Sequence, residues 1–243
     1  MKAIIQKIKM KKLLVALVAI LTIAISANAQ AEENMFSGTA KAGLYSSYVA
    51  GVTGVTFHKN PLLQQSLTVT HNPSGAYVSL WSSYCSEKDF GREIDYTAGI
   101  CRPVGPLQVD ISYSYYNLIP ISTFNGDLHA LVMNVDFPKV GDVTPFINLE
   151  QDLPVNKDVL PGGFLYKVGG KFEIAGVNCA LYAGGHDGAY GIKRETVSII
   201  RLNGCYDLKF DTLTVTPAVG LQVPVQAKVD TQVIGSVVAS YHF

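Results

Sequence analysis

Charged residues are scarce in this chain, and a long apolar run occurs only in its first 25 residues. Only 16% of the 243 residues are Asp, Glu, Lys or Arg, against about 25% in an ordinary soluble protein. Beyond that run, no apolar stretch approaches the roughly 20 residues that a membrane-spanning helix requires. If the mature chain enters a membrane, it must therefore do so as strands. The 22 Gly, 13 Tyr and 10 Phe that accompany the low charge argue against a disordered chain.

The first 29 residues have the three parts of a secretory signal peptide. Five lysines lie within residues 1–12, an almost unbroken run of Leu, Val, Ala and Ile covers 13–25, and Ala27-Asn28-Ala29 supplies a cleavage site. Met10 is an alternative start, because Met10-Lys11-Lys12 is by itself a sufficient basic region. Cleavage after Ala29 leaves 14 basic and 19 acidic residues, a net charge of −5. A chain with this charge is not expected to bind nucleic acid.

The mature chain alternates apolar and polar residues with a period of two. Segment 107–116, for example, places Val109 and Ile111 on one face and Asp110 and Ser112 on the other. Such alternation predicts strands with one apolar and one polar face. Twelve segments are expected to form strands. They are 39–50, 61–71, 75–83, 92–101, 107–116, 127–137, 142–151, 163–173, 177–185, 195–206, 212–223 and 232–243.

Short and long connections alternate between these segments. Short turns such as 72–74 and 174–176 alternate with longer stretches such as 51–60 and 117–126. A transmembrane barrel has short periplasmic turns and longer extracellular loops, and an even strand number places both chain ends in the periplasm. We therefore predict an all-β fold, a transmembrane antiparallel up-and-down barrel of about 12 strands in the cell outer membrane. It would cover residues 39–243, with 30–38 as a short N-terminal segment.

Alternation alone does not say which face points outward. Apolar side chains would pack inward in a soluble barrel or sandwich, and would face lipid in a membrane barrel. Three features favour lipid: segments close to the 9–11 residues of a membrane strand, aromatic residues near segment ends, and polar faces with charges such as Asp95 and Lys171 that a dry core would leave unpaired. The aromatic residues concerned are Tyr45, Tyr48, Trp81, Tyr113, Tyr115, Phe137, Phe164, Tyr206, Tyr241 and Phe243. A soluble exported sandwich is kept as a minor alternative.

The chain ends in Ser240-Tyr241-His242-Phe243, with a terminal aromatic and a second aromatic two residues before it. Both lie on the apolar face of the last predicted strand. This ending resembles the C-terminal strand signature of Gram-negative outer-membrane barrels. The resemblance implies that Tyr241 and Phe243 form a signal for the barrel-assembly machinery.

Four motifs in residues 43–100 resemble the TorF-type porins of proteobacteria. They are Gly43-Leu44-Tyr45-Ser46-Ser47-Tyr48-Val49, Pro61 with Leu63-Gln64-Gln65-Ser66-Leu67, Gly75-Ala76-Tyr77-Val78-Ser79-Leu80-Trp81-Ser82-Ser83, and Glu93-Ile94-Asp95-Tyr96-Thr97-Ala98-Gly99. The resemblance implies a small outer-membrane barrel that acts as a porin, with a poorly defined substrate. The chain departs from the family at Ala50-Gly51-Val52, where members tend to have a basic residue and an aromatic.

The four cysteines and five histidines show no metal-ligand spacing, so neither a metal nor a cofactor is expected. Cys179 and Cys205 fall near the same end of neighbouring strands, where a disulfide could form if both pointed to one face. His186 and Asp187 lie in an expected extracellular loop. A hydrolase at the barrel rim built on this pair is a weak alternative, because a general base needs an orienting carboxylate and an aimed substrate. We expect no enzymatic activity.

The polar face is the candidate functional surface. Eight-stranded barrels are filled by side chains and barrels of 16–18 strands hold an aqueous channel, so twelve strands lie between these cases. Acidic residues fall mainly on the fourth to seventh segments and basic residues on the eighth to tenth. Such segregation would set a transverse field across a narrow pore. The candidate pore-lining residues are Glu93, Asp95, Asp110, Asn148, Glu150, Lys167, Lys171 and Arg201.

These features predict a porin-like channel for passive diffusion of small polar solutes or ions, with outer-membrane lipid around it. The alternative is a non-conducting structural or adhesive barrel that acts through its extracellular loops. Loops such as 117–126 and 152–162 are short for an adhesin, which weighs against it.

Overall fold

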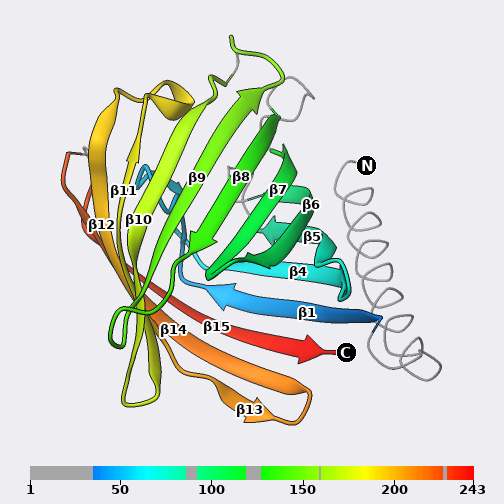
Figure 1. Ribbon diagram of the computed structural model, residues 1–243. Helices are drawn as coiled ribbons and strands as arrows, with labels where there is room; N and C mark the ends of the chain where they lie inside the picture. Colours follow the sequence, from blue (N-terminus) through cyan, green and yellow to red (C-terminus); the bar gives the residue numbers. More distant parts are fainter. Residues whose placement is uncertain (1–34, 86–91, 119–126, 159, 227–228) are drawn as a thin grey trace, which may run out of the picture.

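A computed structural model describes residues 35–85, 92–118, 127–158, 160–226 and 229–243. Twelve long strands in this part of the chain form one closed antiparallel barrel (Figure 1). Each pairs with its neighbours in sequence, and the first pairs with the last. The strands are β1 (Phe36–Tyr45), β4 (Leu62–His71), β5 (Ala76–Tyr84), β6 (Glu93–Val104), β7 (Leu107–Asn117), β8 (Leu128–Asp136), β9 (Thr144–Pro154), β10 (Gly163–Ile174), β11 (Val177–His186), β12 (Glu195–Cys205), β14 (Leu213–Pro224) and β15 (Gln232–His242). The predicted fold class and strand number are confirmed.

Short elements accompany the twelve strands that form the barrel wall. Strands β2 (Tyr48–Val49) and β3 (Thr56–His58) pair with each other and not with the barrel. Strand β13 (Leu208–Phe210) pairs with the start of β14, and the 3₁₀ helix η2 (Ala189–Gly191) lies between β11 and β12. Within the described ranges, no helix is long and apolar enough to cross a membrane. The predicted signal peptide over residues 1–29 lies outside these ranges.

Side chains of the barrel strands alternate between the outer surface and the lumen. On β6, Tyr96 and Ile100 are exposed at 53% and 43%, whereas Thr97 and Gly99 between them, and Asp95 just before them, are less accessible. Large apolar side chains are exposed on strands all round the wall, including Leu44, Val78, Ile111, Leu131, Val168, Leu181, Ile200, Val219 and Val237. A soluble monomer does not expose so continuous an apolar surface, whereas a membrane barrel turns it to lipid. The soluble alternative is therefore wrong.

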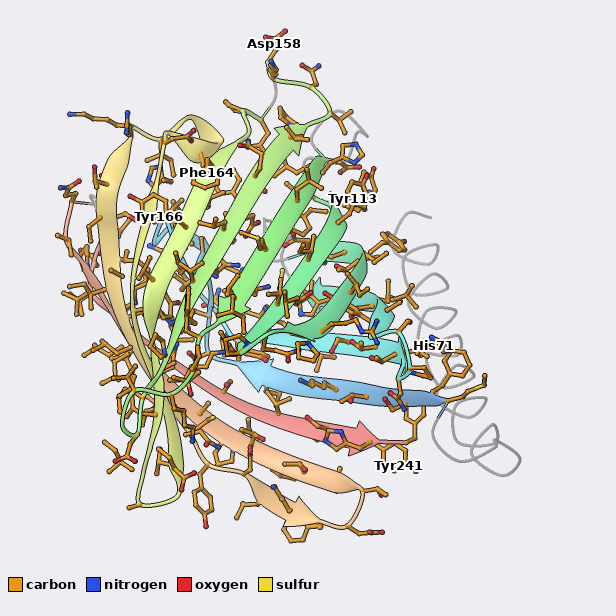
Figure 2. All side chains as sticks on the ribbon, in the orientation of Figure 1. His71, Tyr113, Asp158, Phe164, Tyr166 and Tyr241 are labelled. Atoms are coloured by element: carbon orange, nitrogen blue, oxygen red, sulfur yellow. The ribbon has the colours of Figure 1, made fainter. Side chains whose placement is uncertain are left out.

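Aromatic side chains gather toward the two ends of the wall (Figure 2). Tyr113, Phe164 and Tyr166 lie toward the end with the long loops, and His71 and Tyr241 toward the opposite end. Such bands match the aromatic girdles that flank the apolar belt of membrane barrels. The twelve barrel strands have 9–12 residues each, close to the length that crosses a bilayer.

Three aromatic residues that were expected in the girdles, Tyr45, Tyr48 and Trp81, face the lumen instead. Tyr45 alternates with the exposed Leu44 and so points inward. Trp81 packs against Tyr48 inside the barrel, with ring centroids 5.9 Å apart. Trp81 shares its face of β5 with Ser79 and not with the lipid-facing Val78, so the alternation itself assigns it to the lumen.

Both ends of the described chain meet at one end of the barrel. The Gly38 and Phe243 backbones exchange two hydrogen bonds, at 2.6 Å and 3.0 Å. The short turns lie at this same end, including the two-residue turn Ala175-Gly176, whose φ angles of 51° and 79° are the positive values that a tight hairpin requires. We take this end as periplasmic, as in other barrels with short turns on that side.

Candidate functional site in the barrel lumen

The chain between β1 and β4 folds into the barrel. Strand β1 ends at Tyr45, not near residue 50 as predicted, and residues 46–61 then enter the interior (Figure 1). We call residues 46–61 the lumen hairpin. On one side the Tyr48 hydroxyl donates to Glu93 Oε2 on β6 at 2.7 Å, and on the other Ser198 Oγ on β12 donates to the Val52 carbonyl at 2.6 Å. Because β6 and β12 lie far apart in the wall, the hairpin crosses the lumen.

The tip of the lumen hairpin is buried. Val52 and Thr53 are exposed at only 4% and 2%. Val52 packs in an apolar cluster with Leu165 on β10 and Ala189 of η2. The expectation that 51–60 forms an extracellular loop is thus wrong. A signal was present in the sequence, since residues 49–57 carry no charge and are mostly small or apolar, which suits a buried segment better than a solvated loop.

An acidic wall lines the lumen toward the end with the long loops. It consists of Glu93 and Asp95 on β6 and of Glu150 and Asp152 on β9, all on the inward face. The Tyr116 hydroxyl donates to Glu150 Oε1 at 3.1 Å. Asp152 is only 1% exposed. Asp152 was not among the predicted residues, although its alternation with Glu150 on β9 would have identified it.

Two cations lie on the next strands round the barrel. Lys167 on β10 is the register partner of Asn148 on β9. Arg201 on β12 donates from Nε to Asn203 Oδ1 at 2.8 Å and from Nη1 to Gln222 Oε1 at 3.5 Å. Among the described residues, neither cation has a carboxylate oxygen within 4.0 Å. In the described ranges, neither cation therefore forms an ion pair with the acidic wall, although Lys167 lies on the strand next to Glu150.

The lumen carries a second charged layer nearer the periplasmic end. Asp110 accepts a hydrogen bond from the Tyr77 hydroxyl at 3.0 Å. Lys171 Nζ contacts both oxygens of Asp136 at 2.7 Å. All eight predicted pore-lining residues thus lie on the inward face, in two layers. Their part in permeation stays a prediction.

A cavity of about 230 Å³ lies between the lumen hairpin and strands β6 to β10. Apolar side chains of the hairpin and of neighbouring loops form part of its lining. Its polar lining consists of Tyr48, Glu93, Asp95, Tyr116, Glu150, Lys167 and Tyr190. The cavity brings together four of the eight predicted residues.

Tyr190 joins this cavity from outside the barrel strands, and no sequence motif marks it. It sits in η2 with φ of 59°, a left-handed conformation that is rare for a bulky side chain. Gly188 and Gly191 beside it also have positive φ, which lets the chain make this turn. Burial, with the charges of Asp152 and Glu150 adding to it, raises the pKa of the Tyr190 phenol well above its ordinary value. Tyr190 therefore remains a neutral hydrogen-bond donor at physiological pH.

The His186 and Asp187 side chains do not form the pair that a hydrolase would need. Asp187 Oδ1 accepts a hydrogen bond from the Phe164 backbone N–H at 2.8 Å. His186 is buried, its Nδ1 accepts from the Gly188 N–H at 3.2 Å, and its Nε2 lies 3.9 Å from Glu195 Oε2. Asp187 binds a backbone N–H, and His186 lies near a different carboxylate, that of Glu195. This site therefore gives no support to the rim hydrolase.

None of the four cysteines, all of which lie in the described ranges, forms a disulfide. Cys179 is in register with Gly204, and Cys205 with Asn178, one position along the β11–β12 ladder. Neighbouring positions of a ladder point to opposite faces, so the two thiols lie on opposite sides of the wall and cannot bridge. In the parts of the chain that the structure describes, no group of three or more His, Cys, Asp or Glu could hold a metal ion.

Comparison with known proteins finds similarity in fold. No protein-family model and no curated protein matches the chain. The NanC porin structure superposes with a TM-score of 0.54 at 11% identity, covering 84% of this chain and 98% of that one. The chain has the fold of a porin. The KdgM porin gives a TM-score of 0.51 at 10% identity over 85% of this chain and 99% of its own.

A bacterial polysaccharide outer-membrane secretin has the same porin fold, with a TM-score of 0.50 at 8% identity over 87% of this chain and 99% of its own. A closed barrel with an apolar outer face satisfies every backbone group within lipid, which an open sheet cannot do. The porin-like barrel therefore resides in the outer membrane of a Gram-negative cell.

Proposed function

We propose that the protein is a porin-like channel through which small polar solutes or ions diffuse passively across the outer membrane. The observation that carries this proposal is the polar, charged inward face of a closed 12-stranded barrel, with a cavity left beside the lumen hairpin. The fold shared with the NanC and KdgM porins supports it. A channel must release what it binds, so only weak contacts are needed.

The arrangement of charge supports a preference for cations. In the layer of the lumen hairpin, four carboxylates on β6 and β9 face two cations on β10 and β12. Charged side chains around a narrow passage set the selectivity of a pore. We propose that the path runs along the acidic wall, and that the eight inward residues predicted from the sequence line it.

The C-terminal strand supports a role in assembly. The Phe243 backbone pairs with Gly38, and its ring lies over the space that a side chain at Gly38 would fill. Tyr241 stacks on Phe243 with ring centroids 6.2 Å apart. We propose that this pair is read by the barrel-assembly machinery, and that the chain is related to TorF-type porins through its N-terminal motifs.

The direct test of channel function is conductance. The mature chain should be refolded into a planar lipid bilayer, with a heat-modifiable gel band as the check that the barrel has formed. Discrete current steps are expected. A heat-modifiable barrel that gives no steps would contradict the proposal and favour the non-conducting structural barrel.

Charge reversal in the lumen should change ion selectivity. Lysine in place of Asp95 or Asp110 is expected to shift the permeability ratio toward anions, and glutamate in place of Lys167 or Lys171 to shift it toward cations, because each change inverts one wall of the transverse field. The reversal potential under a salt gradient measures the ratio. Asp158→Lys, at the tip of a long loop (Figure 2), is the control. If the four lumen variants fold and keep the wild-type ratio and conductance, the transverse field is wrong.

A further inference from the structure

The lumen cavity carries more buried negative charge than its hydrogen bonds account for. Glu93, which lines this cavity, is exposed at only 6%. Oδ1 of Asp95, which also lines it, is buried without a hydrogen-bond partner. A buried carboxylate that lacks a partner is unfavourable, so such groups are normally paired with a cation or a donor. The unpartnered oxygen of Asp95 therefore leaves a place for a donor or a cation in this cavity.

Two tyrosines hold the carboxylates that line the cavity. Tyr48 donates to Glu93 Oε2 at 2.7 Å, and Tyr116 donates to Glu150 Oε1 at 3.1 Å. Each hydrogen bond fixes the orientation of one carboxylate. With Tyr190, these residues also place three aromatic rings round the cavity. Aromatic faces attract a cation, most strongly where water is excluded.

The cation that this cavity lacks is not supplied by the described side chains. Lys167 lines the same cavity, but none of the carboxylate oxygens in the described ranges lies within 4.0 Å of its Nζ. The carboxylates are also not clustered as ligands of a metal ion, within the residues that can be described. A volume of about 230 Å³ has room for several carbon atoms beside a charged nitrogen. These facts favour an organic cation over a bare ion.

We propose that the cavity is a binding site for a small organic cation of the alkylammonium class. The ammonium group would lie between Glu93, Asp95 and Glu150, and its carbon chain against the tyrosine rings and the apolar side of the lumen hairpin. This inference rests on the proposed channel function and adds the class of solute that the channel takes. Lys167 then acts as a competing charge that keeps the affinity low enough for release.

The chain contains a natural reporter for this site. Trp81 is its only tryptophan, and it packs on Tyr48, the residue that holds Glu93. Binding beside Glu93 should therefore change the fluorescence of Trp81. The refolded mature barrel in detergent micelles would be titrated with butylammonium, butyramide and butyrate, which are similar in size and differ in charge. A saturable change is expected with butylammonium alone. An equal response to butyramide, or a stronger one to butyrate, would overturn the proposal.

Substitutions in the cavity sharpen the test. Glu150→Gln and Asp95→Asn each remove one charge without changing shape, and each should weaken butylammonium binding about tenfold, as expected for the loss of one charged hydrogen bond. Asp158→Asn removes the same charge at a loop tip and should leave binding unchanged. Lys167→Met should tighten binding, because it removes the competing cation. Weaker binding by Lys167→Met would indicate an anion or zwitterion site and would overturn the proposal.

The bilayer assay separates this inference from the channel function. Current steps in potassium chloride test the channel, and a concentration-dependent reduction of those steps by butylammonium tests the site. Steps that butylammonium does not reduce, together with an unchanged Trp81 signal, would overturn the site and leave the channel. A saturable Trp81 signal from a barrel without steps would uphold the site and contradict the channel.

Discussion

Removing the tip of the lumen hairpin is expected to raise the single-channel conductance several-fold. Residues 51–54 form the tip of the hairpin that reaches β12, and Val52 and Thr53 are buried there. The chain can be rejoined locally, because the Ala50 N–H donates to the Val55 carbonyl at 2.8 Å and the two cut ends already lie side by side. A wider lumen conducts more current at the same voltage. Single-channel recording in a planar bilayer measures the change.

A matched deletion separates this effect from general damage. Removing residues 139–142 shortens the exposed turn between β8 and β9 at the other end of the barrel, and should leave the conductance unchanged. Both variants must first show the heat-modifiable band of a folded barrel. A folded variant without residues 51–54 that conducts like the wild type would show that the hairpin does not limit the current.

Gly169→Ala is expected to destabilise the barrel by about 2 kcal/mol, as overpacking of a filled interior does. Gly169 lies on the inward face of β10, in register with Tyr182 on β11. A Cβ at this position would lie 2.2 Å from the Leu181 carbonyl oxygen and 2.8 Å from the Tyr182 Cα. These are backbone atoms, so a change of rotamer cannot relieve the clash and the two strands must move apart.

The control for Gly169→Ala is Gly235→Ala on β15, where nothing lies within 4 Å of an added Cβ. Urea unfolding of the refolded barrels, followed by the heat-modifiable fraction, compares the two. The Gly169 variant should unfold at clearly lower urea, and the Gly235 variant close to the wild type. Equal midpoints for both variants would mean that the β10–β11 pair accepts a methyl group, contrary to the expectation.

Much of the barrel wall could be predicted because successive side chains of a strand point to opposite faces, whatever the strand packs against. The alternation of Val109 and Ile111 with Asp110 holds wherever the strand lies, so the inward residues were identifiable without knowing the neighbours. The one strand predicted in the wrong place is the first, because nothing in its local pattern shows that the chain leaves the wall after Tyr45. The break is set by contacts made far away, such as Ser198 with Val52, 146 residues apart.

The contents of the lumen depended on the same distant contacts. The alternation rule placed Glu93, Asp95 and Glu150 inside, but not the hairpin and Tyr190 that close a cavity round them. Tyr190 belongs to a loop that turns back over the barrel, and its position depends on a left-handed backbone conformation rather than on a pattern of residues. The paths of such loops are set by packing in three dimensions. The periodicity of apolar residues in one sequence gives no information on that packing.

The pairing of the first strand with the last has a consequence for biogenesis. Thr39 and His242 are partners 203 residues apart, so the wall cannot be sealed until the C-terminal strand has been delivered. Before that moment, β1 and the most recently paired strand each have an unpaired edge, and such edges promote aggregation. The hairpin that fills the interior bonds to both β12 and β15. The contacts that anchor the hairpin to the last strands can therefore form only once those strands have arrived, and an exported chain must be kept from pairing with its neighbours until then.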